Sequence, residues 1–145
     1  MQDLPHQYQV NASAELEGNV VLKADELPQL ITAPPAEFGG PGDQWSPETL
    51  LVSSVVGCLI LTFRAMARGS KVPWISLDCT AEGVLDRVES ITRFTGFQIN
   101  AELTIPSGTS EERADRLLHR AEQFCLITNS LKARPQLVST IRTVD

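Results

Sequence analysis

The cysteines are the residues of this sequence whose side chains are best suited to chemistry. Cys58 stands in the middle of the most apolar segment, SPETLLVSSVVGCLILTF at 46–63. A thiol in such surroundings either fills the core as a small hydrophobic group or, as a thiolate, acts as a nucleophile. Cys125 ends the apolar stripe of a second segment, and Cys79 lies on the inward face of an alternating one. Composition alone does not decide whether each of the three cysteines packs in the core or reacts as a nucleophile.

The spacing of these residues disfavours several other kinds of site. The three cysteines lie far apart and form no C-x-x-C pair, which argues against a zinc site and against a disulfide framework. We therefore predict no metal and no cofactor, with the thiols reduced. His119 lies six residues before Cys125, or about 240° around a helix, so a Cys-His dyad is not expected. We place it on the solvated face of the charge-rich segment SEERADRLLHR at 110–120.

The apolar segment is predicted to be a long helix. Ser46 offers a hydroxyl for the N-cap, Pro47 suits the first helical position, and Glu48 is favourable near the positive end of the helix dipole. Gly69 is a natural stop, so the pattern predicts a helix over about 47–68. The middle of this helix is apolar on every side, which predicts burial on every side.

Sequence patterns typical of strands occur both before and after this helix. Alternation over 8–14 and a turn at 17–19 predict a hairpin with 20–22, and the Pro- and Gly-rich stretch 33–45 predicts an irregular loop. Two extended stretches after the helix are predicted to form an antiparallel hairpin with one face on the core. The inward residues are Ile75, Leu77, Cys79 and Ala81 in the first, and Phe97, Ile99, Ala101, Leu103 and Ile105 in the second.

A second helix and a last strand complete the pattern. Thr109 and Glu112 form a predicted capping box. The helix that follows would turn one apolar stripe inward, with Cys125 at its end, and QLVSTIRTV at 136–144 is predicted to be the closing strand. The stripe consists of Ala114, Leu117, Leu118, Ala121 and Cys125.

The order of elements predicts an α+β fold in which helices pack on antiparallel sheet. A helix that is apolar on every side needs more cover than one sheet provides. A second copy of the chain is the simplest source of that cover. We therefore expect a homodimer.

Length and charge narrow the classes of partner. A chain of 145 residues is the size of one domain, which we place over 1–145. The net charge of -6 argues against nucleic acid or an anionic membrane as the main partner. The apolar run at 50–63 is shorter than the roughly 20 residues that cross a bilayer. MQDLPHQYQV at the start has no apolar signal-peptide core, so we expect a cytoplasmic protein.

Two motifs in order resemble the OsmC/Ohr family of thiol-dependent peroxidases. The first is SPETLLVSSVVGCL, with Glu48 ten residues before Cys58, and the second is AEQFCLITNSLK around Cys125. The dipeptide Glu82-Gly83 stands in the strand between them. The resemblance covers almost the whole chain, from the first hairpin to the final strand.

The resemblance implies an intertwined homodimer in which antiparallel sheets wrap around a central buried helix, with two active sites between the subunits. In that family, the cysteine matching Cys58 attacks an organic hydroperoxide and becomes a sulfenic acid. The cysteine matching Cys125 then resolves it as an intramolecular disulfide. A dithiol, carried by lipoyl groups in the best-described branch, reduces the disulfide.

The sequence departs from the family at one charged residue. The family uses an arginine from the N-terminal hairpin region, held by the glutamate that matches Glu48, to stabilise the thiolate, but no arginine precedes Arg64 here. Lys23, Arg64 and Arg93 are the candidates for a replacement. If none of them acts, the alternative function is a dimer that binds a small apolar ligand without peroxidase activity. Glu48 would then simply favour the helix start.

Overall fold

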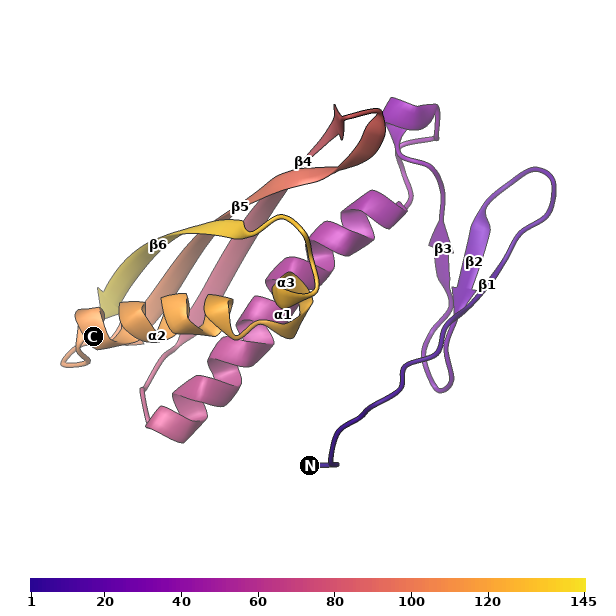
Figure 1. Cartoon of the computed structure of the whole chain (residues 1–145). Coiled ribbons are helices and arrows are strands. Elements are labelled where there is room, and N and C mark those ends of the chain that lie inside the picture. The colour runs from indigo at the N-terminus through magenta and orange to yellow at the C-terminus, as the bar shows by residue number, and fades with distance from the viewer. The chain divides into compact units, whose positions relative to one another are not determined.

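The chain forms a sheet of short strands, then one long helix, and then a second sheet with two further helices, as Figure 1 shows. The computed structural model describes residues 1–145. It divides into two units, Met1–Leu50 and Leu51–Asp145. The prediction of a single domain over 1–145 stays a prediction. The elements are β1 (Asn11–Ser13), β2 (Val20–Lys23), β3 (Leu30–Thr32), η1 (Ala36–Phe38), α1 (Pro47–Ser70), β4 (Ser76–Val88), β5 (Ile91–Pro106), α2 (Glu111–Gln123), α3 (Leu126–Asn129) and β6 (Pro135–Val144).

The first unit contains a three-stranded antiparallel sheet in the order β1-β2-β3. The predicted hairpin is present, with Ala12 opposite Leu22, but its first strand is shorter than the alternation suggested. Tyr8 and Val10 lie outside β1 and are exposed, because apolar alternation alone cannot hold a strand that buries neither face. The predicted irregular loop contains the short 3-10 helix η1.

The first turn of α1 is capped as the sequence predicts. The Ser46 hydroxyl oxygen accepts a hydrogen bond from the Thr49 amide at 3.1 Å, and the Ser46 carbonyl accepts one from the Leu50 amide at 2.9 Å. The side chain thereby satisfies an amide that has no partner inside the helix.

The other end of α1 differs from the prediction. Gly69 lies inside the helix, which continues to Ser70. Lys71 adopts the left-handed conformation with φ 52°, and the Val72 amide donates to the Ala67 carbonyl at 3.0 Å. This pattern is a Schellman motif, in which the buried Val72 closes the last turn. A glycine was not needed because this motif holds the left-handed residue in place.

The sheet of the second unit has the order β4-β5-β6 and is mixed. β4 and β5 form the predicted antiparallel hairpin, with Cys79 opposite Ala101. β6 runs parallel to β5, so the expectation of a purely antiparallel sheet was wrong here. Parallel neighbours need a long crossover, and α2 and α3 provide it. Ile75 lies before β4 and is 54% exposed, contrary to its predicted inward position.

One continuous core joins the sheet to its helices within the second unit. Alternate residues of β5 are buried, as predicted, and face single stripes of α1 and α2. The buried residues of these elements are Val55, Leu59, Phe63 and Ala67 of α1, Phe97, Ile99, Ala101, Leu103 and Ile105 of β5, and Ala114, Leu117, Leu118 and Ala121 of α2.

Only one stripe of α1 is buried within a single chain, so the expectation of burial on every side is not met there. Leu61 is 60% exposed, and Gly57 and Ala65 are exposed as well. The helix is also longer than the apolar run suggested. By length and composition it could cross a bilayer, with a mean hydropathy of 2.0 and 22% of its most apolar stretch buried. Core helices of globular proteins can be equally long and apolar.

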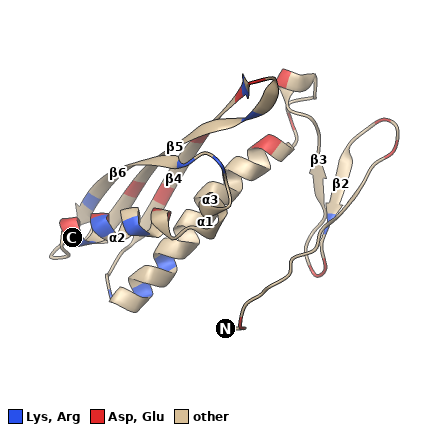
Figure 2. Ribbon diagram, in the orientation of Figure 1, with Lys and Arg blue, Asp and Glu red and all other residues tan.

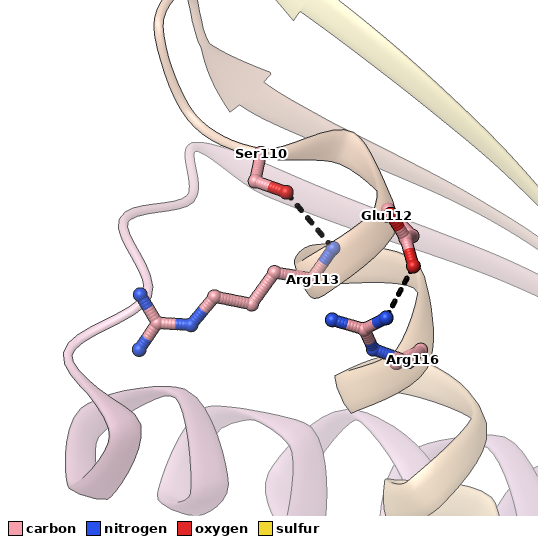
Figure 3. A network of polar contacts seen from close by, with 4 residues as sticks. All are labelled: Ser110, Glu112, Arg113 and Arg116. Carbon is pink, nitrogen blue, oxygen red and sulfur yellow. Dashed lines mark hydrogen bonds and ion pairs between the residues drawn. The ribbon is translucent and has the colours of Figure 1, made fainter.

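The N-cap of α2 lies one residue later, and its last residue two residues earlier, than the sequence predicted. Ser110, rather than Thr109, is its N-cap and accepts a hydrogen bond from the Arg113 amide at 3.2 Å (Figure 3). The helix stops at Gln123, so Cys125 does not end its stripe. Cys125 is instead the N-cap of α3 and is fully buried.

Gly83 allows α1 to approach the sheet closely. A Cβ atom built there would lie 2.8 Å from a ring carbon of Phe94 and 2.9 Å from a methyl carbon of Val52. We predict that Gly83→Ala lowers the free energy of unfolding by about 1–3 kcal/mol through overpacking, as measured by urea denaturation. Gly96→Ala is the matched control, because its Cβ would meet nothing within 4 Å. Equal stabilities for the two variants would contradict this account.

Candidate thiol site

Cys58 and Cys125, predicted from separate segments, are brought together by the second unit. Cys58 lies in the middle of α1 and is half-buried, whereas Cys125 precedes α3 and is fully buried. The Cys125 thiol acts as a hydrogen-bond donor toward the sulfur of Cys58 and lowers its pKa. Both are free thiols. The geometry thus places a second sulfur beside the one in the helix.

The Cys58 thiol opens into an apolar pocket of about 740 Å³ between α1 and the crossover. A volume of this size is typical of sites for small molecules. One face comes from α1 and the other from the end of α2 and the start of α3. The lining residues are Ser54, Gly57, Cys58, Leu61, Thr62, Ala65 and Met66 of α1, with Arg120, Phe124, Leu126 and Ile127 opposite.

The pKa of Cys58 lies below its ordinary value. Burial of the sulfur acts in the opposite direction, but hydrogen bonds to the thiolate outweigh it. The donors are the Cys125 thiol, the Ile127 amide, the Thr62 hydroxyl and the Leu126 amide. The Thr62 oxygen lies 3.8 Å from the sulfur. All of these donors are uncharged, so neutral hydrogen-bond donors lower the pKa of Cys58.

The start of α3 explains why two main-chain amides are available. Cys125 has the extended backbone of an N-cap, but its side chain makes no capping hydrogen bond. The first amides of a helix have no partner within it, and here those of Leu126 and Ile127 serve the Cys58 sulfur instead. A serine or threonine at this position would compete for them.

The pKa of Cys125 shifts the other way. Burial raises it, and the hydrogen bond with Cys58 raises it further, because that bond favours the protonated form of Cys125. The amide and hydroxyl of Thr128 only partly oppose this shift. The pair is therefore asymmetric, with the negative charge favoured on Cys58 and the proton on Cys125.

Cys79 is separate from this pair. It lies on β4 and does not line the pocket. Burial and the neighbouring Asp78 carboxylate raise its pKa to about 11. At neutral pH it is an unreactive thiol of the core.

The charged residues proposed from the sequence lie elsewhere in the chain. Glu48 belongs to the first unit, where its Oε2 atom is covered and has no hydrogen-bond partner. Arg64 lines a different cavity, and Arg93 donates to the Phe94 carbonyl at 3.4 Å. Lys23 ends β2 in the first unit. The roles of Glu48 and Lys23 stay predictions. No group of three or more His, Cys, Asp or Glu side chains is placed to hold a metal ion.

The sequence interpretation missed the donors of the site. Thr62 follows Cys58 by one helical turn, and this spacing of four residues was a usable signal. The amides of Leu126 and Ile127 had no such signal, because the break between α2 and α3 carries neither glycine nor proline. His119 also makes a polar contact that the sequence interpretation did not predict. Its Nε2 atom lies 3.0 Å from the Ser139 hydroxyl oxygen.

Comparison with known proteins identifies relatives of this chain. Residues 40–140 match the family model described as OsmC-like protein. A Bacillus subtilis protein, the uncharacterized protein YmaD, is 23% identical over 106 residues, which are 71% of each chain.

Solved structures share the fold. An OsmC-like protein of unknown function from Vibrio cholerae has a TM-score of 0.82 at 17% identity, covering 94% of this chain and 99% of its own. An organic hydroperoxide resistance protein from Legionella pneumophila has a TM-score of 0.75 at 22% identity, covering 97% and 99%. One from Elizabethkingia anophelis has a TM-score of 0.77 at 18% identity, covering 99% and 100%.

The asymmetry of the thiols predicts an order of reactivity. Cys58 should be alkylated first by iodoacetamide, with a midpoint below that of a free cysteine, because its lowered pKa yields thiolate at lower pH. Thr62→Val removes one donor, worth about 0.5–1.5 kcal/mol, and should raise the midpoint by up to about one pH unit. Peptide mass spectrometry across a pH series measures both. Thr80→Val on the exposed side of β4 is the control. Faster labelling of Cys79 would contradict the assignment.

Proposed function

The chain belongs to the OsmC-like protein family, and from this premise we propose that it is a thiol-dependent peroxidase that reduces organic hydroperoxides in defence against oxidative stress. The observation that carries the proposal is the pairing of Cys58 with Cys125 beside an apolar pocket. Solved proteins with this fold include two named for organic hydroperoxide resistance. The reducing cytoplasm is the compartment that we propose, because the cycle starts from free thiols.

The first step uses the lowered pKa of Cys58. Its thiolate attacks the terminal oxygen of the hydroperoxide, the O–O bond breaks, and the alkoxide takes up a proton and leaves as an alcohol. Sulfur is oxidised to a sulfenic acid while the peroxide is reduced. The apolar pocket would hold the organic part of the peroxide and limit access of water.

The second step uses the thiol that keeps its proton. The sulfur of Cys125 attacks the sulfenic sulfur of Cys58, an S–S bond forms, and the hydroxyl group leaves as water with the Cys125 proton. A dithiol partner, such as a lipoyl group on another protein, then exchanges with the disulfide and is itself oxidised. The raised pKa of Cys125 suits this order, because it keeps the resolving sulfur out of competition for the peroxide.

A homodimer forms part of the proposal. The face of α1 with Gly57, Leu61 and Ala65 is exposed within one chain, although it is apolar. A second copy would cover this face, and because the same three residues line the thiol pocket, the pocket would then lie between the two subunits. Ten residues of helix span about 15 Å, so Glu48 could assist a Cys58 sulfur only if it came from the partner across antiparallel α1 helices.

The exposed face of α1 predicts how the dimer can be broken. Leu61→Glu places a charge on this face and should weaken self-association by about 100-fold, because burying an unpaired carboxylate is costly. Sedimentation velocity over a range of protein concentrations measures the change. Ile91→Glu, at the exposed end of the β4–β5 hairpin, should leave the dimer intact. A native chain that sediments as a monomer at all concentrations would refute the dimer.

A specific observation also supports a second function. The donors that reach Cys58 are all uncharged, whereas the family supplies a cation at this point. A thiolate stabilised only by neutral donors would react slowly. The pocket would then serve a dimeric binding protein for a small apolar ligand.

Cysteine variants decide between the two functions. The native chain should consume cumene hydroperoxide in the presence of dihydrolipoamide and form a Cys58–Cys125 disulfide without an added oxidant other than the peroxide. Cys58→Ser should reduce consumption to the background rate. Cys125→Ala removes the resolving sulfur without adding a capping hydroxyl, so it should allow one turnover and then accumulate the sulfenic acid, trapped by dimedone and detected by mass spectrometry.

Cys79→Ser is the matched control and should retain native turnover, because Cys79 lies outside the pocket. Native turnover in Cys58→Ser would refute the peroxidase. If the native chain neither consumes peroxide nor forms the disulfide, the apolar-ligand function takes its place.

A further inference from the structure

Thr128 carries the only buried hydroxyl of the second unit, with 1% of its surface exposed. It lies in α3, three residues after Cys125 and beyond the break that ends α2. A hydroxyl buried without a hydrogen bond is costly, whereas a valine of similar shape would avoid that cost. The acceptors within reach of this hydroxyl therefore indicate what it does.

The Thr128 hydroxyl has two main-chain acceptors. Its oxygen lies 3.1 Å from the Cys125 carbonyl oxygen and 3.4 Å from that of Glu122. A hydroxyl has one proton to donate, so it cannot fully satisfy both. Each carbonyl also has a second donor, because the Asn129 amide donates to Cys125 at 3.0 Å and the Cys125 amide donates to Glu122 at 3.1 Å. The hydroxyl proton can therefore turn away without leaving either carbonyl unpaired.

The Cys125 sulfur is a third acceptor. The hydroxyl and the main-chain amide of Thr128 both act as donors toward this sulfur and lower its pKa. Cys125 is the N-cap of α3 and Thr128 is the third residue of that helix, so its amide is one that an N-cap side chain reaches. The protonated thiol makes no capping hydrogen bond, as expected of a weak acceptor, whereas a thiolate accepts strongly.

The helical segments next to the two sulfurs offer no charge for this purpose. α3 and residues 49–63 of α1 carry no charged side chain, as Figure 2 shows. Arg120 of α2 lines the pocket but is not among the groups that shift the pKa of Cys125. The only groups that lower this pKa belong to Thr128, which does not donate to Cys58. The resolving sulfur thus depends on one residue for its stabilisation.

Oxidation of Cys58 changes what holds the proton on Cys125. In the reduced pair, the hydrogen bond with Cys58 and the charge of its thiolate both raise the pKa of Cys125. Neither effect remains once the Cys58 thiolate has become an uncharged group. Burial still opposes ionisation, and the two Thr128 donors still favour it. The disulfide-forming step therefore begins with a Cys125 thiol that loses its proton more easily than in the reduced chain.

We propose that Thr128 is a catalytic residue of the disulfide-forming step: its hydroxyl turns from the main-chain carbonyls to the Cys125 sulfur and stabilises the thiolate that attacks Cys58. This role rests on the proposed function, in which the attack forms the S–S bond and breaks the S–O bond of the sulfenic acid. The Cys125 proton leaves with the hydroxide as water, and Cys125 is oxidised while the sulfenic sulfur is reduced. Thr128 keeps its own proton throughout.

A disulfide reagent tests this role without any peroxide. Dithiobis(nitrobenzoic acid) forms a mixed disulfide with the Cys58 thiolate and releases one thionitrobenzoate. The Cys125 thiolate then attacks the Cys58 sulfur and releases the second. Absorbance follows the two releases in the full chain carrying Cys79→Ser, so that they report on Cys58 and Cys125 in turn.

Thr128→Val keeps the amide and the branched shape but removes the hydroxyl. We expect it to slow the second release about tenfold at neutral pH, the effect of losing one hydrogen bond to a charged group. The pH midpoint of that release should rise by about one unit, because the thiolate has lost a donor. The first release should be unchanged. Thr128→Ala should match Thr128→Val, and Thr128→Ser should restore the native rate and midpoint because it returns the hydroxyl.

Two controls separate a catalytic role from a merely structural one. Thr104→Val makes the same change at a half-buried threonine of β5 that does not line the thiol pocket, and it should leave both releases unchanged. The iodoacetamide midpoint of Cys58 is the second control. If Thr128 only held the start of α3 in place, Thr128→Val would displace the Leu126 and Ile127 amides and raise that midpoint as well.

Four results would overturn the proposal. They are an unchanged second release in Thr128→Val, slowing of that release without a shift of its midpoint, a raised Cys58 midpoint in the same variant, and the absence of a second release from the parent chain. A chain that responds as expected here but consumes no peroxide would refute the peroxidase and leave the role of Thr128 in disulfide formation standing.

Discussion

The hydrogen bond between the Cys125 and Cys58 thiols is the interaction on which the site depends. It lowers the pKa of one sulfur and raises that of the other, so two chemically identical groups acquire different pKa values. Such a division requires the two sulfurs to remain neighbours, and this requires α1 and the β5–β6 crossover to keep their positions relative to each other. The core beneath them, where α1 and α2 both pack on β5, maintains these positions.

Neutral donors replace a charge in this arrangement. Burial of a thiol ordinarily raises its pKa, and a nearby cation is the usual remedy. Here the main-chain amides of Leu126 and Ile127 reach the sulfur, together with the hydroxyl of Thr62. A main-chain amide is not removed when a side chain is substituted, and it does not change position with a side-chain rotamer. Part of the stabilisation is therefore built into the backbone, and it depends on α3 beginning after its N-cap Cys125 rather than continuing from α2.

The sequence predicted the parts of the fold that have local signals. The Ser46 cap, the β4–β5 hairpin and the buried stripe of α2 all follow from side-chain types at fixed spacings, and each is present. The direction of β6 could not be predicted, because parallel and antiparallel partners of β5 need the same alternation. The break after Gln123 was missed for a similar reason, since the residues around it could equally have continued the helix. The contact between Cys58 and Cys125 depends on that break, so the resemblance to known peroxidases suggested the pair but local patterns could not place it.

The path of the chain between the two sulfurs has a thermodynamic consequence. β4, β5 and α2 all lie between Cys58 and Cys125, so a bond between the sulfurs would close a loop around most of the second unit. Closing a loop of roughly seventy residues removes chain entropy from the unfolded state worth about 4 kcal/mol. Redox state and resistance to unfolding would thus be linked, and the oxidised chain that meets its reductant would be the more stable form.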